Sequence, residues 1–140
     1  MKGFLLGAGC LISLAAVTGL AQAASRYAAT LANVVDAVTY VVDVHMDGQV
    51  QRIRLVLDGV EGPKLYGRQC EREAALFAKE LARSILHPAE RLIISDLHRE
   101  NAQFVGRIEF DGRSLENVLI GFNQVRPRGN VVNWCSAGMG

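Results

Sequence analysis

Residues 33–64 of this 140-residue chain carry apolar residues in runs as well as in alternation with polar ones, and that stretch organises the rest. Val34–Val44 is rich in Val, Thr and Tyr, which is typical of a strand buried on much of both faces in a small barrel. Asp47-Gly48 predicts a tight hairpin turn, because both central residues of such a turn need positive φ. The strand pattern resumes over Val50–Leu57, so residues 33–64 are expected to supply the first strands of a barrel.

A helical period follows these strands. Residues 24–32 show no clear period and are expected only to lead into the first strand, whereas residues 58–67 carry three glycines and a proline and predict a loop. The helix predicted over Cys70–Leu86 stops at His87-Pro88, because proline cannot continue the hydrogen-bond ladder. One apolar stripe of this helix is expected to face the core, and its members are Cys70, Ala74, Phe77, Leu81 and Ile85.

Two further strands and a second helix complete the pattern. Arg91–Leu97 and Gln103–Phe110 have strand character, and Ser114–Val125 predicts a helix that Ser114 caps and that ends near a left-handed Asn123. The order is then three strands, a helix, two strands and a helix. A helix between strands three and four of a five-stranded barrel defines the oligonucleotide/oligosaccharide-binding (OB) architecture, here with two or three helices.

Residues 1–23 predict a signal peptide. Lys2 provides the basic start, residues 4–20 are apolar, and a small-x-small site places cleavage between Ala23 and Ala24. An uncleaved anchor is the first alternative. A lipoprotein at Cys10 is the second, although Gly7 stands where such signals carry Leu or a similar residue. We favour cleavage, which leaves one periplasmic or secreted domain, residues 24–140, without a transmembrane segment.

Charge and cysteine content narrow the function. Removal of Lys2 with the leader leaves basic and acidic side chains in balance, so charge does not indicate a nucleic-acid partner, although it leaves one possible. Export leaves two cysteines, Cys70 and Cys135, and in an oxidising compartment an even pair predicts a disulfide. Two separate buried thiols are the alternative. His45, His87 and His98 are scattered and show no metal-ligand spacing.

Four pieces of the chain together resemble the staphylococcal nuclease-like (thermonuclease) domain family. In chain order they are Val35-Asp36-Ala37-Val38-Thr39, Leu57 with Gly59–Leu65, Glu73-Ala74 with Phe77, and Asn101-Ala102-Gln103 with Phe110-Asp111-Gly112. They are similar to the family's V-D-G-D-T opening, its R-L-x-G-I-D-A-P-E-L strand and loop, the E-A…F of its first helix and its Y-G-R…D-G. The resemblance spans about residues 30–125. It implies the OB-fold of the staphylococcal nuclease type and a calcium-dependent phosphodiester hydrolysis.

Carried onto this chain, the family's metal and base positions are mostly replaced. The first calcium-binding acid falls on Val38, which has no side-chain oxygen, and the second falls on Glu61. The water-activating glutamate falls on Lys64, a cation at neutral pH. Asp36 and Glu61 remain as weak metal candidates, and Asp58 could join them as a substitute ligand.

The family's two phosphate-binding arginines are also changed. The first falls on Val56, although Arg54 could stand in because a two-residue step keeps the same face of a strand. Whether Arg52 or Arg54 reaches the cleft is left open. The second arginine falls on Gln103, which has no charge. The remnant cleft would therefore consist of Arg54, Glu61, Lys64 and Gln103.

These replacements favour a non-catalytic, exported binding or interaction module without a cofactor, a degenerate member of the family. Its partner would be another protein or an anionic ligand. The alternative is a calcium-dependent nuclease with substitute ligands. A third hypothesis is a structural part of an envelope assembly.

Overall fold

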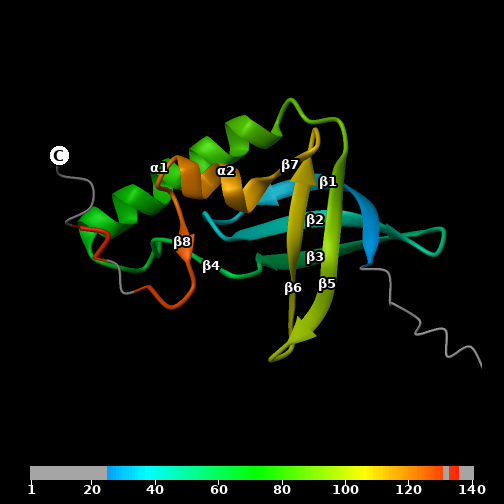
Figure 1. The fold of residues 1–140 in the computed structure, drawn as a ribbon, viewed down its shortest axis with the longest axis horizontal. Helices are drawn as coiled ribbons and strands as arrows, with labels where there is room; N and C mark the ends of the chain where they lie inside the picture. Colours follow the sequence, from blue (N-terminus) through cyan, green and yellow to red (C-terminus); the bar gives the residue numbers. More distant parts are fainter. Residues whose placement is uncertain (1–24, 131–132, 136–140) are drawn as a thin grey trace, which may run out of the picture.

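The computed structural model describes residues 25–130 and 133–135, and the predicted leader and its cleavage site lie outside them. Five strands form a barrel in the order β3-β2-β1-β5-β6 (Figure 1). The barrel is closed by β6, which pairs in parallel with β3. The barrel strands are β1 (Arg26–Val34), β2 (Thr39–Met46), β3 (Gln49–Leu57), β5 (Leu92–Glu100) and β6 (Gln103–Phe110). This is an OB-like barrel, as the pattern of elements predicts.

Two helices and three short strands complete the described part of the chain. Both helices lie on the same side of the barrel strands in the view of Figure 1, and neither is long and apolar enough to cross a membrane. Two of the short strands pair with each other and tie the tail to the loop after β3. The remaining elements are α1 (Gln69–Leu86), α2 (Leu115–Gly121), β4 (Val60–Glu61), β7 (Arg113–Ser114) and β8 (Arg126–Pro127).

The N-terminal boundary of the barrel differs from the prediction. Strand β1 covers residues 26–34, so it takes in most of residues 24–32, which were expected only as a lead-in, and it pairs with both β2 and β5. The predicted strand over residues 34–44 is interrupted, because the amides of Val35 and Asp36 both donate to the Thr39 carbonyl, at 2.9 and 3.2 Å, and close a turn. The buried Tyr40 hydroxyl fixes this turn by donating to the Ala37 carbonyl at 2.7 Å.

Helix α1 packs through a different face from the predicted one. Its buried residues are Ala75, Ala78, Ala82 and Leu86. Phe77, which was expected in the core, is 64 % exposed. Alanines present almost no side chain, so they let the helix axis approach the barrel closely, whereas the bulkier stripe would hold it away. The predicted stripe is therefore correct only at its margin, where the partly buried Ile85 packs against the core, and the alanine face makes the main contact.

Helix α2 begins as predicted and is shorter than expected. The Ser114 hydroxyl accepts from the Asn117 amide at 3.3 Å and caps the first turn. The helix ends at Gly121 rather than at Val125, and Asn123 adopts a left-handed φ of 58°. The predicted left-handed residue is thus confirmed, two residues beyond the end of the helix.

Glu116, in the first turn of α2, is a buried carboxylate that joins the helix to β6. It accepts from the Ile108 amide at 3.1 Å and from the Ser114 hydroxyl at 2.9 Å, and only 6 % of the residue is exposed. Burial raises its pKa above the ordinary 4.5, while those two hydrogen bonds and the charge of Arg107 oppose the shift. Folding therefore makes this side chain easier to protonate than it is in the unfolded chain.

Replacing Glu116 by Gln is expected to remove one pH dependence of stability. A raised folded-state pKa adds stability that is complete below the unfolded value and is lost as pH rises through the folded value. Urea unfolding of both proteins between about pH 4 and pH 8 should show the wild type gaining stability over Glu116→Gln as pH falls. Parallel curves over this range would mean that burial does not disfavour the charged carboxylate.

Candidate functional site

The position expected to hold the first metal-binding acid is filled by packed hydrocarbon. Val38 is 7 % exposed, and its carbonyl accepts from the Leu57 amide at 2.8 Å. A Cβ added at Gly62 would lie 3.2 Å from Val38 Cγ1 and 3.0 Å from the Ala37 Cβ. The loop after β4 therefore lies directly against the Val38 methyl groups.

Asp36, a weak metal candidate from the sequence, is occupied within its own turn. Its Oδ1 accepts from the Val38 amide at 2.9 Å. It does not line the pocket that contains Glu61, the other candidate. Of the three carboxylates that a substitute calcium site would share, Asp36, Asp58 and Glu61, only Glu61 lines this pocket.

Glu61 and Lys64 line a hollow of about 490 Å³ beside the C-terminal tail, here called the tail pocket. The Cys70–Cys135 disulfide, predicted from the sequence and present with a Cα–Cα distance of 5.2 Å, holds the tail there. The tail pocket is lined by Glu61, Gly62, Lys64, Arg68, Glu71, Asn133, Trp134 and Cys135. The nearby Tyr66 is 85 % exposed and is not among them.

The charged side chains of the tail pocket balance. Lys64 and Arg68 face the same hollow as Glu61 and Glu71. Glu71 also accepts from the Lys64 amide at 3.0 Å, so its carboxylate is committed to the turn that precedes α1. Equal numbers of acids and bases give this pocket no preference for an anion.

Arg54 and Gln103 line a second hollow, of about 320 Å³, where β3 meets β6; it is here called the seam pocket. Parallel pairing sets Val56 beside Val105 and Leu55 beside Phe104, which brings β3 and β6 side chains together. The seam pocket is lined by Gln51, Arg52, Ile53, Arg54, Val56, Ala102, Gln103 and Phe104. The guanidinium of Arg99 lies 4.4 Å from the centre of the Phe104 ring.

Arg52 and Arg54 both line the seam pocket, but only one is engaged elsewhere. Arg52 donates to the Asp43 carboxylate at 2.8 and 3.0 Å, and this contact lowers the pKa of Asp43. Among the described residues, the exposed Arg54 guanidinium makes no ion pair or hydrogen bond. Arg54 is thus the arginine that is available to a ligand.

The predicted remnant cleft is therefore divided between two hollows. Arg54 and Gln103 lie together at the seam, and Glu61 and Lys64 lie together beside the tail. The sequence does not identify Phe104 as part of the seam. An apolar residue in a predicted strand is expected in the core, and nothing in the sequence shows that this side chain stays partly exposed. Pairing between strands distant in the chain was needed to place it.

The barrel and its hollows define a class of protein, an OB-like β-barrel domain with two helices in its described part and a disulfide-bound tail. Comparison with known proteins finds no matching family model and no similar curated protein. The disulfide is compatible with an extracytoplasmic location.

Proposed function

We propose that this domain is an exported, non-catalytic binding module of the staphylococcal nuclease type. The contact between Val38 and Gly62 carries the proposal, since methyl groups occupy the position where the resemblance calls for a calcium-binding acid. Calcium requires several oxygen ligands at about 2.3–2.6 Å, and hydrocarbon supplies none.

The loss of the base supports the same conclusion. Lys64 replaces the water-activating glutamate, and a lysine ammonium cannot accept a proton near neutral pH. The arginine positions are separated from Glu61 and Lys64, because the two groups line different hollows. In enzymes, removal of a single group that stabilises the transition state typically lowers the rate by two to three orders of magnitude. Here the calcium ligand and the catalytic base are both replaced.

The ligand that we propose is an anion bound at the seam pocket. Arg54 has no competing partner in the described chain, Gln103 adds hydrogen-bonding capacity, and Arg99 lies beside the apolar ring of Phe104. The combination suits a group with a charged phosphate or carboxylate and an apolar or planar part. By contrast, the balanced charges of the tail pocket do not favour an anion.

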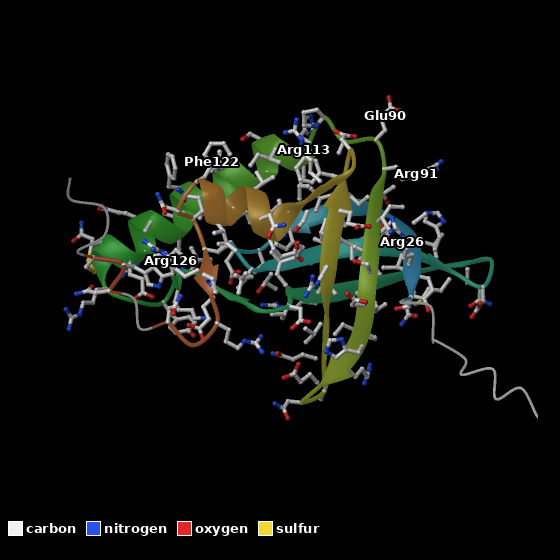
Figure 2. The ribbon with its side chains drawn as sticks, in the orientation of Figure 1. Arg26, Glu90, Arg91, Arg113, Phe122 and Arg126 are labelled. Carbon is white, nitrogen blue, oxygen red and sulfur yellow. A yellow bond between two sulfur atoms is a disulfide. The ribbon has the colours of Figure 1, made fainter. Side chains whose placement is uncertain are left out.

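A binding titration against salt tests this proposal. Labelled single-stranded DNA should bind with an affinity that falls as salt rises, and Arg54→Ala should weaken it roughly tenfold, the value of one charge-assisted hydrogen bond. Arg113→Ala is the matched control, because this exposed arginine lies beyond the opposite end of β6 from Gln103 (Figure 2). Equal affinities for the two variants would remove the seam from the proposal.

A cleavage assay separates the module from the nuclease alternative. The purified protein should leave single-stranded DNA and RNA intact with calcium and with a chelator. Calcium-dependent cleavage that disappears in Glu61→Gln would establish the enzyme instead.

A further inference from the structure

Three side chains with metal-ligating atoms converge where β5 passes the end of β3. The carboxylates of Asp58 and Glu100 and an imidazole nitrogen of His98 lie within 4.8 Å of one another. His98 and Glu100 are two residues apart on β5, so their side chains leave the same face of the strand. Asp58 follows β3, and its amide donates to the Gly106 carbonyl at 2.8 Å, which fixes it against the barrel.

The His98 ring is oriented as a ligand requires. Its Nδ1 lies 2.7 Å from the Asp96 carbonyl and its Nε2 faces the Glu100 carboxylate, so a neutral ring that donates through Nδ1 turns the lone pair of Nε2 toward the cluster. Asp96 lies in an irregularity between Ser95 and His98, where strand β5 loses register with β6. Such bulges re-aim a side chain, and this one brings the ring within reach of the preceding backbone.

The spacing of the ligand atoms matches a coordination edge. His98 Nε2 lies 3.5 Å from a Glu100 carboxylate oxygen. Two ligands bonded to one tetrahedral zinc ion at about 2.0–2.1 Å are themselves about 3.4 Å apart. The Asp58 carboxylate makes no hydrogen bond or ion pair with another described residue, and its negative charge acts on the His98 ring.

We propose that Asp58, His98 and Glu100 form a binding site for a divalent transition-metal ion of the zinc type. One imidazole nitrogen and two carboxylates suit zinc and its neighbours better than calcium, which prefers oxygen ligands alone. Three protein ligands leave a position for water or for an anionic group. This site does not involve the calcium position at Val38, but it adjoins the seam pocket, because Glu100 lines a smaller hollow together with Val56 and Gln103.

One nearby cation opposes metal binding and provides a control. This cation is Arg128, whose Nη1 lies 3.9 Å from the second Glu100 oxygen. The other arginine close by, Arg107, pairs instead with the Asp96 carboxylate, at 3.6 Å from its Nε. The arginine at Glu100 competes with a metal for the same carboxylate. Removal of Arg128 should therefore strengthen metal binding. If the contact between Arg128 and Glu100 were only a surface ion pair with no metal site beside it, removal of Arg128 would produce no such gain.

Isothermal titration with zinc chloride tests the site on the full chain, expressed with its own leader and purified without an affinity tag. One zinc ion per chain is expected, and His98→Ala should weaken binding by at least about tenfold, because even supporting residues of metal sites are worth 10–100-fold. Glu100→Gln should act in the same direction, and Arg128→Ala should tighten binding. His45→Ala, at an exposed histidine on β2, should leave it unchanged.

Imidazole nitrogen resonances provide a second readout. Zinc should shift the Nε2 resonance of His98 and leave that of His45 in place. Absence of zinc binding, equal affinity of wild type and His98→Ala, or equally tight binding of calcium would each overturn the proposal.

Discussion

Loss of the Cys70–Cys135 disulfide is expected to lower the free energy of unfolding by about 4 kcal/mol. The bond closes a loop with a sequence separation of 65 residues, and the open chain gains conformational freedom mainly in the unfolded state. The double variant Cys70→Ser, Cys135→Ser should therefore unfold at a lower urea concentration than the oxidised wild type. Because both cysteines are replaced, no unpaired thiol complicates the comparison.

The disulfide variant should also change the tail pocket. Trp134 is the only tryptophan in the chain, and it lines this pocket next to Cys135. Release of the tail should expose its indole and shift its emission to longer wavelength under conditions where the barrel remains folded. A double variant with wild-type stability and an unchanged emission maximum would show that the pairing of β4 with β8 holds the tail without the bond.

Replacement of Val38 by Asp is expected to lower the free energy of unfolding at neutral pH by about 3–5 kcal/mol, as for an uncompensated buried charge. The position is 7 % exposed and lies against Gly62, so little water reaches a carboxylate there. Burial should raise the pKa of this new acid, and the loss should shrink as pH falls and the acid becomes neutral. Urea unfolding at neutral and acid pH measures both effects.

The neutral Val38→Asn variant separates charge from shape. Its side chain matches Asp in size, so the difference between the two at neutral pH reports the charge alone. Millimolar calcium should stabilise Val38→Asp no more than Val38→Asn, because Lys64 and the occupied Asp36 leave too few oxygen ligands. Restoration of wild-type stability by calcium would instead mean that one substitution had removed the metal site of an otherwise complete nuclease.

The sequence predicts the parts of the fold that local chemistry determines. The Asp47-Gly48 hairpin and the Ser114 cap depend on the backbone or side-chain chemistry of those residues alone. The disulfide depends on an even number of cysteines in an oxidising compartment. Strand β1 was missed because its small residues carry no period, and its pairing with β2 and β5 is what makes it a strand. The apolar stripe predicted for α1 is not the face that packs most closely on the barrel, because close packing favours small alanine side chains over bulky ones.

The candidate sites depend on contacts that alternation cannot reveal. The sequence predicts a strand at Arg54 and another at Gln103, and it is the parallel pairing of β3 with β6 that makes these two residues share a hollow. In the sequence His98 is one of three scattered histidines, and its only signal is the two-residue spacing from Glu100. Asp58 reaches them only through the barrel closure, across about 40 positions of chain.

The placement of the disulfide also divides the chain covalently. Strands β5 and β6 and helix α2 lie inside the closed ring between Cys70 and Cys135, whereas β1, β2 and β3 lie outside it. A protease that cuts the backbone once within the ring releases no separate fragment, and the severed ends stay tethered through the sulfur bridge. In a compartment exposed to proteases, this half of the barrel is protected against loss by a single nick, and the other half is protected only by its pairing.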